Sequence, residues 1–126
     1  MLTLGTGDLT LALDAESGGA VARFELSTAT ATAPLFRPAT SHNVFDASCY
    51  PLVPYANRLR DGTFQFRGRS IRLPPNVPGQ KHPLHGQGWL ASWRVTEKGP
   101  ASAELSFTHL AGDWPWDYEA RQRFAY

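Results

Sequence analysis

The sequence has few of the features that mark secreted, membrane and nucleic-acid-binding proteins. It has one cysteine, Cys49, in 126 residues, so no disulfide can form within the chain. A net charge of +1 provides no basic surface, and we expect neither nucleic acid nor a membrane as a partner. The start, MLTLGTGDLTLALD, lacks the regions of a signal peptide, and no run reaches the ~20 apolar residues of a membrane helix. We therefore expect a cytoplasmic location.

Motifs for several kinds of catalysis are also missing. There is no Gly-x-Ser-x-Gly elbow, no glycine-rich phosphate loop and no pair of carboxylates placed for glycoside hydrolysis. His82 and His85 suggest a metal pair by their spacing, but Pro83 keeps them off a helix and a strand would put them on opposite faces. We expect no metal and no cofactor.

A hydrophobic period of two runs through the chain and predicts an all-β protein. Leu9, Leu11 and Leu13 alternate with polar or small residues, as in a strand with one buried face. Similar patterns predict further strands in residues 20–26, 102–108 and 118–126. No stretch of ten residues has a helical pattern. We predict an antiparallel β-sandwich.

Residues 63–73, TFQFRGRSIRL, predict a tight hairpin. Its turn falls at Arg67 and Gly68, where glycine readily takes a positive φ. The register that this turn sets brings Phe64 opposite Ile71, with the polar side chains on the other face. A shift by one residue would mix the two faces, so the pattern favours this register.

The last predicted strand runs to Tyr126 without a turn or polar tail after it. Such an edge invites pairing with another strand. We therefore expect the sequence to be cut short. We also expect oligomers that form through exposed sheet edges.

Two clusters could carry chemistry, and the first is PLVPYANRLRDGTF at residues 51–64. It places Asn57, Arg58 and Arg60 beside a turn at Asp61, and loops on a rigid β scaffold are common binding sites. Arginine and asparagine donate to hydroxyl oxygens, and the asparagine carbonyl also accepts. A surface ion pair between one of these arginines and Asp61 or another carboxylate is the alternative explanation.

The second cluster is HPLHGQGW at residues 82–89. Gly86 and Gly88 bring backbone close to whatever His85 faces, and a histidine suits proton transfer near neutral pH. Trp89 offers an apolar face for a sugar ring and an N–H as a polar group. The alternative is a buried tryptophan and a turn histidine that makes structural bonds only.

The two clusters together resemble the aldose 1-epimerase, or galactose mutarotase-like, family. The matching text is LVPYANRLRDGTFQFRGRSIRLPPN, then HPLHGQGW, then WRV, in this order and with a hairpin between the first two. The resemblance implies a partial galactose mutarotase-like (supersandwich) fold. In that fold, residues 1–126 would be the N-terminal portion of a single mutarotase-like β-sandwich domain whose C-terminal remainder is absent. It also implies interconversion of the α and β anomers of free aldoses by acid–base ring opening, without a cofactor.

The resemblance also implies roles for individual residues. Arg58 and His85 match the arginine and histidine that bind the sugar, and His85, near the ring oxygen and C1, is the candidate catalytic residue. With Asn57 and Trp89 they form the expected substrate-binding set. The general acid histidine, the general base glutamate and a substrate-holding aspartate lie further along a longer chain in the family. Nothing here matches them, so we expect normal epimerase turnover to be absent.

Three functions remain open from the sequence. The first is the epimerase, present here in truncated form without the full catalytic set. The second is a non-catalytic carbohydrate-binding β-sandwich module, and the third is an accessory or structural β domain of a glycoside hydrolase. A small-molecule sugar, an aldohexose or a related compound, is the expected partner in the first two.

Overall fold

The computed structural model describes all residues from 1 to 126, and its regular elements are nine strands and three short 3₁₀ helices. The strands are β1 (Leu2–Thr6), β2 (Leu9–Asp14), β3 (Ala20–Ser27), β4 (Thr32–Pro34), β5 (Thr63–Phe66), β6 (Arg69–Arg72), β7 (Arg94–Lys98), β8 (Ser102–His109) and β9 (Tyr118–Ala125). Three single-turn 3₁₀ helices connect them: η1 (Val44–Asp46), η2 (Arg60–Gly62) and η3 (Gly88–Leu90). All named strands pair antiparallel, which confirms the predicted class. No helix has the length and apolar character needed to cross a membrane.

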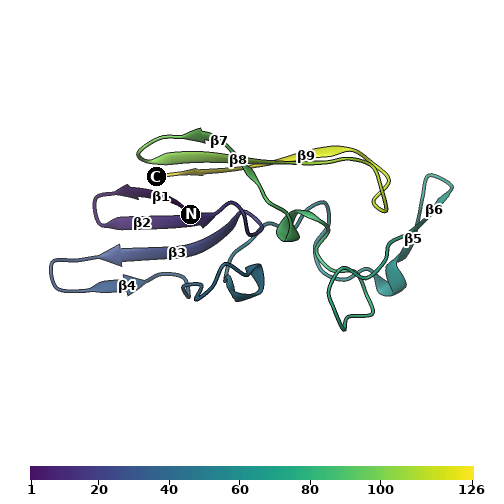
Figure 1. The fold of residues 1–126 in the computed structure, drawn as a ribbon, viewed down its shortest axis with the longest axis horizontal. Coiled ribbons are helices and arrows are strands. Elements are labelled where there is room, and N and C mark those ends of the chain that lie inside the picture. The colour runs from purple at the N-terminus through teal and green to yellow at the C-terminus, as the bar shows by residue number, and fades with distance from the viewer.

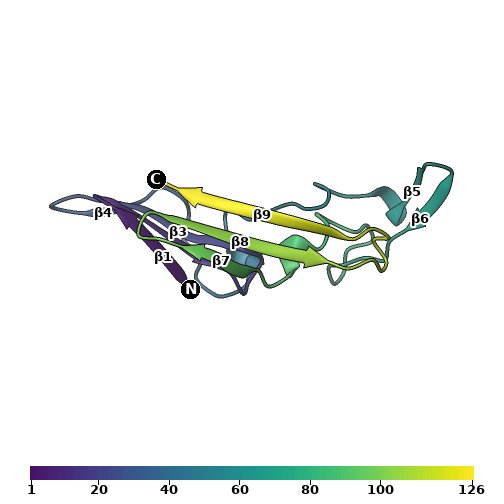
Figure 2. The same cartoon turned by 90° about the horizontal axis from the view of Figure 1, so that it is seen from above.

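The strands form two larger sheets and one separate hairpin. The sheet β1-β2-β3-β4 lies at one end of an elongated molecule and β5-β6 lies at the other end (Figures 1 and 2). The sheet β7-β8-β9 begins beside the first sheet, and its strands β8 and β9 extend toward the hairpin. Both sheets contribute to one core, which contains Leu2, Leu4, Leu13, Val21, Trp93, Ala103 and Leu105. Burial of these apolar side chains is the main force that holds the two sheets together.

Strand β2 departs from the one-sided pattern that its leucines predict. Ala12, Leu13 and Asp14 are all buried, so the end of the strand is covered on both faces. A bulge between Ala12 and Leu13 shifts the register against β3 and breaks the alternation of side chains. Strand β1, which the sequence analysis did not predict, pairs with the outer edge of β2.

The hairpin β5-β6 forms with the predicted turn and register. Phe64 pairs with Ile71, and the Ile71 side chain is buried. Arg67 and Gly68 both have positive φ, at 48° and 74°, as a two-residue type I′ turn requires. The sequence predicted a positive φ for Gly68 alone, and the structure adds a positive φ at Arg67.

Backbone hydrogen bonds fix the connection before β7 against the turn between β2 and β3. Gly18 N–H donates to the carbonyl of Ala91 at 2.9 Å, and Trp93 N–H donates to that of Ala15 at 2.7 Å. The Trp93 indole N–H also donates to the Gly88 carbonyl at 2.8 Å. These bonds place the segment HPLHGQGW at a fixed position beside the two sheets.

Candidate functional site

The two predicted clusters lie side by side, because short backbone segments from each pair with one another. Arg58 forms an antiparallel bridge with Leu84. His85 N–H donates to the Asn57 carbonyl at 3.0 Å, and Leu59 N–H donates to the carbonyl of Pro83 at 3.1 Å. The structure therefore brings together Asn57, Arg58 and His85, which are 28 residues or fewer apart in the sequence but belong to separate loops.

The His85 ring has one nitrogen committed to the protein. The backbone N–H of Asn57 donates to Nδ1 of His85 at 2.8 Å. An acceptor nitrogen carries no proton, so the neutral ring carries its proton on Nε2. Burial lowers the pKa of His85 below its ordinary value, and the nearby charge of Arg58 lowers it further. The site thus presents a neutral imidazole with Nε2–H as a donor.

Arg58 is exposed, and its guanidinium makes no ion pair or hydrogen bond within the protein. The alternative that an arginine pairs with Asp61 is wrong, since Asp61 binds Lys81 at 2.8 Å and lies 3.8 Å from His82. Side-chain bonds to Lys81 and its charge lower the pKa of Asp61. The five donors of Arg58 remain available for a ligand.

Asn57 shapes the loop as well as offering a side chain to solvent. Its φ of 65° lies in the left-handed region, where asparagine is tolerated better than most residues. Its Oδ1 accepts from the N–H of Arg58 at 2.9 Å, while its own N–H is the group bound to His85. Its side-chain NH₂ makes no bond and is free to donate.

Trp89 lies in the interior, with 1% of its surface exposed. Tyr50 stacks on it with ring centroids 5.5 Å apart, and Phe45 and His85 contact it edge-on. Its indole N–H donates to the Leu84 carbonyl at 3.0 Å. The open apolar face that we expected for a sugar is therefore not presented, because neighbouring aromatic rings cover the indole. Trp89 instead supports the loop that carries His85.

The glycines of the second cluster serve packing within the protein. A Cβ on Gly86 would collide with the Val53 carbonyl and the Pro54 ring, and one on Gly88 would collide with the Val53 side chain. Their close contacts are with the segment before Asn57. This close packing and a backbone bridge between Val53 and Gly86 hold the two clusters against each other.

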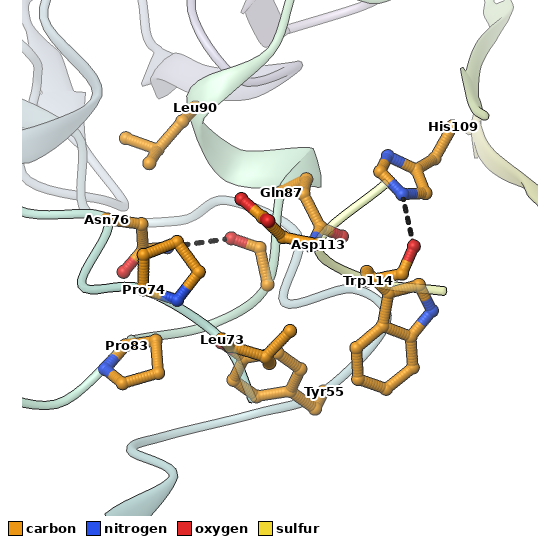
Figure 3. Close-up of a pocket in the computed structure, with 11 residues that line it drawn as sticks. Tyr55, Leu73, Pro74, Asn76, Pro83, Gln87, Leu90, His109, Asp113 and Trp114 are labelled. Atoms are coloured by element: carbon orange, nitrogen blue, oxygen red, sulfur yellow. Dashed lines mark hydrogen bonds between the residues drawn. The ribbon is translucent and has the colours of Figure 1, made fainter. Parts of the chain in front are cut away.

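A cavity of about 270 Å³ borders the same loop on another side. Its lining includes Tyr55, Asn76, Gln87, His109 and Asp113, and Arg58 and His85 are not among the lining residues (Figure 3). This volume is just below the roughly 300 Å³ at which small-ligand pockets begin. The sequence analysis missed this group, although Gln87 lies within the quoted motif.

Gln87 links the loop to strand β9. The Tyr118 hydroxyl donates to Oε1 of Gln87 at 2.9 Å. Burial, and then the neighbouring Tyr55, raise the pKa of Tyr118 to about 12, so its hydroxyl stays protonated and remains a donor. His42 is exposed and bonds buried Asp14 at 2.7 Å, and His109 ends β8.

Comparisons with known proteins agree with this architecture. The family model described as aldose 1-epimerase matches residues 1–125. The uncharacterized protein YphB of Escherichia coli K12 is 38% identical over 123 residues, which cover 97% of this chain and 40% of YphB. A candidate aldose 1-epimerase of Escherichia coli K12 has a crystal structure that matches with a TM-score of 0.88 at 38% identity, over 99% of this chain and 41% of that one. The GalM/aldose epimerase homologue from C. elegans matches in fold, with a TM-score of 0.79 at 20% identity over 98% of this chain and 41% of that one.

These matches define an antiparallel β-sandwich of the galactose mutarotase-like class. The chain belongs to the aldose 1-epimerase family. It spans about two fifths of the length of the relatives described above.

Proposed function

We propose that this chain forms the sugar-holding part of an aldose 1-epimerase site, in which Asn57, Arg58 and His85 bind a free aldose. The observation that carries the proposal is the pair of unused donors on adjacent segments. Arg58 has a guanidinium without a protein partner, and His85 has its Nε2–H free while Nδ1 is bound. Such donors match the hydroxyl and ring oxygens of a sugar.

The state of His85 defines what it can do in ring opening. Mutarotation needs a base at the C1 hydroxyl and an acid at the ring oxygen. Loss of the Nε2 proton from a ring whose Nδ1 has none would leave an imidazolate, so His85 is a poor general acid in this state. It can instead donate a hydrogen bond to the ring oxygen, where negative charge develops, and so stabilise the transition state.

The remaining parts of the proposal follow from the chemistry of the site. The partner is a small neutral sugar, and Trp89 contributes by supporting His85 rather than by stacking on the sugar. The residues that would transfer protons have no matching motif in this chain, so its own contribution is binding and orientation. We propose a cytoplasmic location, in keeping with a single, unpaired cysteine.

The test measures sugar binding by the 126-residue chain, using NMR titration with glucose and galactose. Arg58→Ala should weaken binding by about tenfold or more, since a hydrogen bond to a charged group is worth about 1.5–3 kcal/mol. His85→Ala should weaken it by about two- to tenfold, since a hydrogen bond between neutral groups is worth about 0.5–1.5 kcal/mol. Arg60→Ala is the matched control, because Arg60 lies in η2 beside Asp61 and should leave affinity unchanged. Equal affinity in all three variants would remove the assignment.

A second candidate function is a carbohydrate-binding module without catalysis. It is favoured by sugar-holding donors that occur here without a matching acid and base. Polarimetry of freshly dissolved α-glucose or α-galactose separates the two functions. Faster equilibration of the anomers supports the epimerase, and binding without acceleration supports the module.

A further inference from the structure

The backbone around His85 has a conformation that needs support from outside the loop. His85 has a φ of 60°, in the left-handed region that residues with a Cβ rarely adopt. Gly86 follows with a φ of 71°, and Asn57, which faces His85, has a φ of 65°. Residues in such conformations persist when their surroundings over-determine them, and they concentrate at functional sites.

Asn76 contacts the chain on both sides of His85. Its side-chain NH₂ donates to the carbonyl of Leu84 at 2.7 Å and to the carbonyl of Gly86 at 3.0 Å. Its Oδ1 accepts from the N–H of Leu84 at 2.7 Å. The side chain is half-buried, and it lies between this loop and the cavity of Figure 3. Three bonds from one amide thus hold the residues before and after His85.

Only an amide of this length satisfies the arrangement. The two carbonyls need two donors, and the Leu84 N–H needs an acceptor, a combination that an asparagine side chain supplies and an aspartate or leucine does not. The Asn76 side chain makes no hydrogen bond to Arg58, Asn57 or the His85 ring. Any effect on the ring therefore passes through the backbone of Leu84 and Gly86.

We propose that Asn76 is a positioning residue for His85. It holds the backbone so that Nδ1 of His85 meets the Asn57 N–H, which keeps the proton on Nε2 and directs that donor away from the protein. The consequence for sugar binding rests on the proposed function, whereas the effect on the His85 ring does not.

The experiment uses the 126-residue chain with labelled histidine and two variants. Asn76→Asp keeps the shape and the acceptor but removes both donors, and Asn76→Ala removes all three bonds. Thr28→Ala is the matched control, because the Thr28 hydroxyl also makes three side-chain-to-backbone bonds, in the exposed turn after β3. NMR of the imidazole nitrogens reports the tautomer of His85, and a sugar titration reports affinity.

In the unsubstituted chain and in Thr28→Ala, we expect His85 to be neutral with its proton on Nε2. In both Asn76 variants we expect a mixture of tautomers, with sugar affinity lower by about twofold or more and by no more than in His85→Ala, because the same neutral donor is misplaced. An unchanged tautomer in a folded variant would overturn the proposal. Unfolding of both variants would also overturn it, because a positioning role leaves the fold intact. A changed tautomer with unchanged affinity would support the role of Asn76 and reject that of His85 in sugar binding.

Discussion

Among single residues, His85 has surroundings that oppose its protonation in two separate ways. Burial and the Arg58 charge both disfavour the imidazolium. The Asn57 N–H also points at Nδ1, so a second proton there would face another donor and break the bond. These contacts keep the ring neutral, with Nε2–H as its donor, without a carboxylate partner.

The titration of His85 provides a direct prediction. The histidine should titrate below its ordinary value of 6.5 in the folded chain. Arg58→Met should raise its pKa part of the way toward that value, since the charge is removed but burial remains. NMR titration of the imidazole measures the shift. Arg60→Met is the control, because Arg60 is not among the causes of the shift.

The sign of the linkage to stability follows from the same shift. Because the folded state binds the proton less tightly than the unfolded state, the contribution of His85 to stability is complete above pH 6.5 and falls as the pH drops below it. Urea denaturation at several pH values should therefore show a smaller slope with pH in His85→Gln than in the unsubstituted chain. Equal slopes in the two proteins would contradict the prediction.

Gly86 is the residue whose substitution should cost most in this loop. A Cβ would strain a φ of 71° and collide with the backbone of Val53 and the Pro54 ring. We expect Gly86→Ala to lower the free energy of unfolding by about 3 kcal/mol. Gly68→Ala, at a φ of 74° with open space around it, should cost only about 1 kcal/mol. Urea denaturation measures both, and equal losses would show that the packing against Val53 is unimportant.

Among the elements, strand β8 forms the middle of its sheet and supplies the centre of the core. Leu105 has none of its surface exposed, whereas Leu110, just after β8, is 74% exposed. Leu105→Ala should lower the free energy of unfolding by about 3 kcal/mol, through lost burial and the cavity left behind. Leu110→Ala should change it by less than about 0.5 kcal/mol. Chemical denaturation measures both, and similar losses would mean that Leu105 is not in the core.

The hairpin β5-β6 and the strand β2 show why local patterns predict one element better than another. The register of Phe64 against Ile71 was predicted correctly because the turn and the alternation agree with each other. In β2, the bulge after Ala12 depends on pairing with β3 and on the sheet that covers it, and neither is visible in a pattern of leucines.

In the molecule as a whole, each sheet ends in strands that have a free edge. Strand β4 is short, exposed and ends at Pro34, features that discourage further pairing. Strand β9 is eight residues long and pairs only with β8, so its other edge is available. We predict reversible association of the chain. Sedimentation or light scattering between about 10 μM and 1 mM should show a mass that rises with concentration. A constant monomer mass over this range would contradict the prediction.

The local pattern of the chain was enough to predict its class and most of its strands, whereas the residues of the candidate site were predicted from the resemblance to a family. Alternation of apolar and polar side chains depends on neighbours two positions apart, so it can be read without a fold. The pairing of Asn57 with His85, the burial of Trp89 and the three bonds of Asn76 depend on contacts between separate loops. Those contacts exist only once packing of the sheets brings the loops together, and they set the proton position on His85 that the proposed function requires.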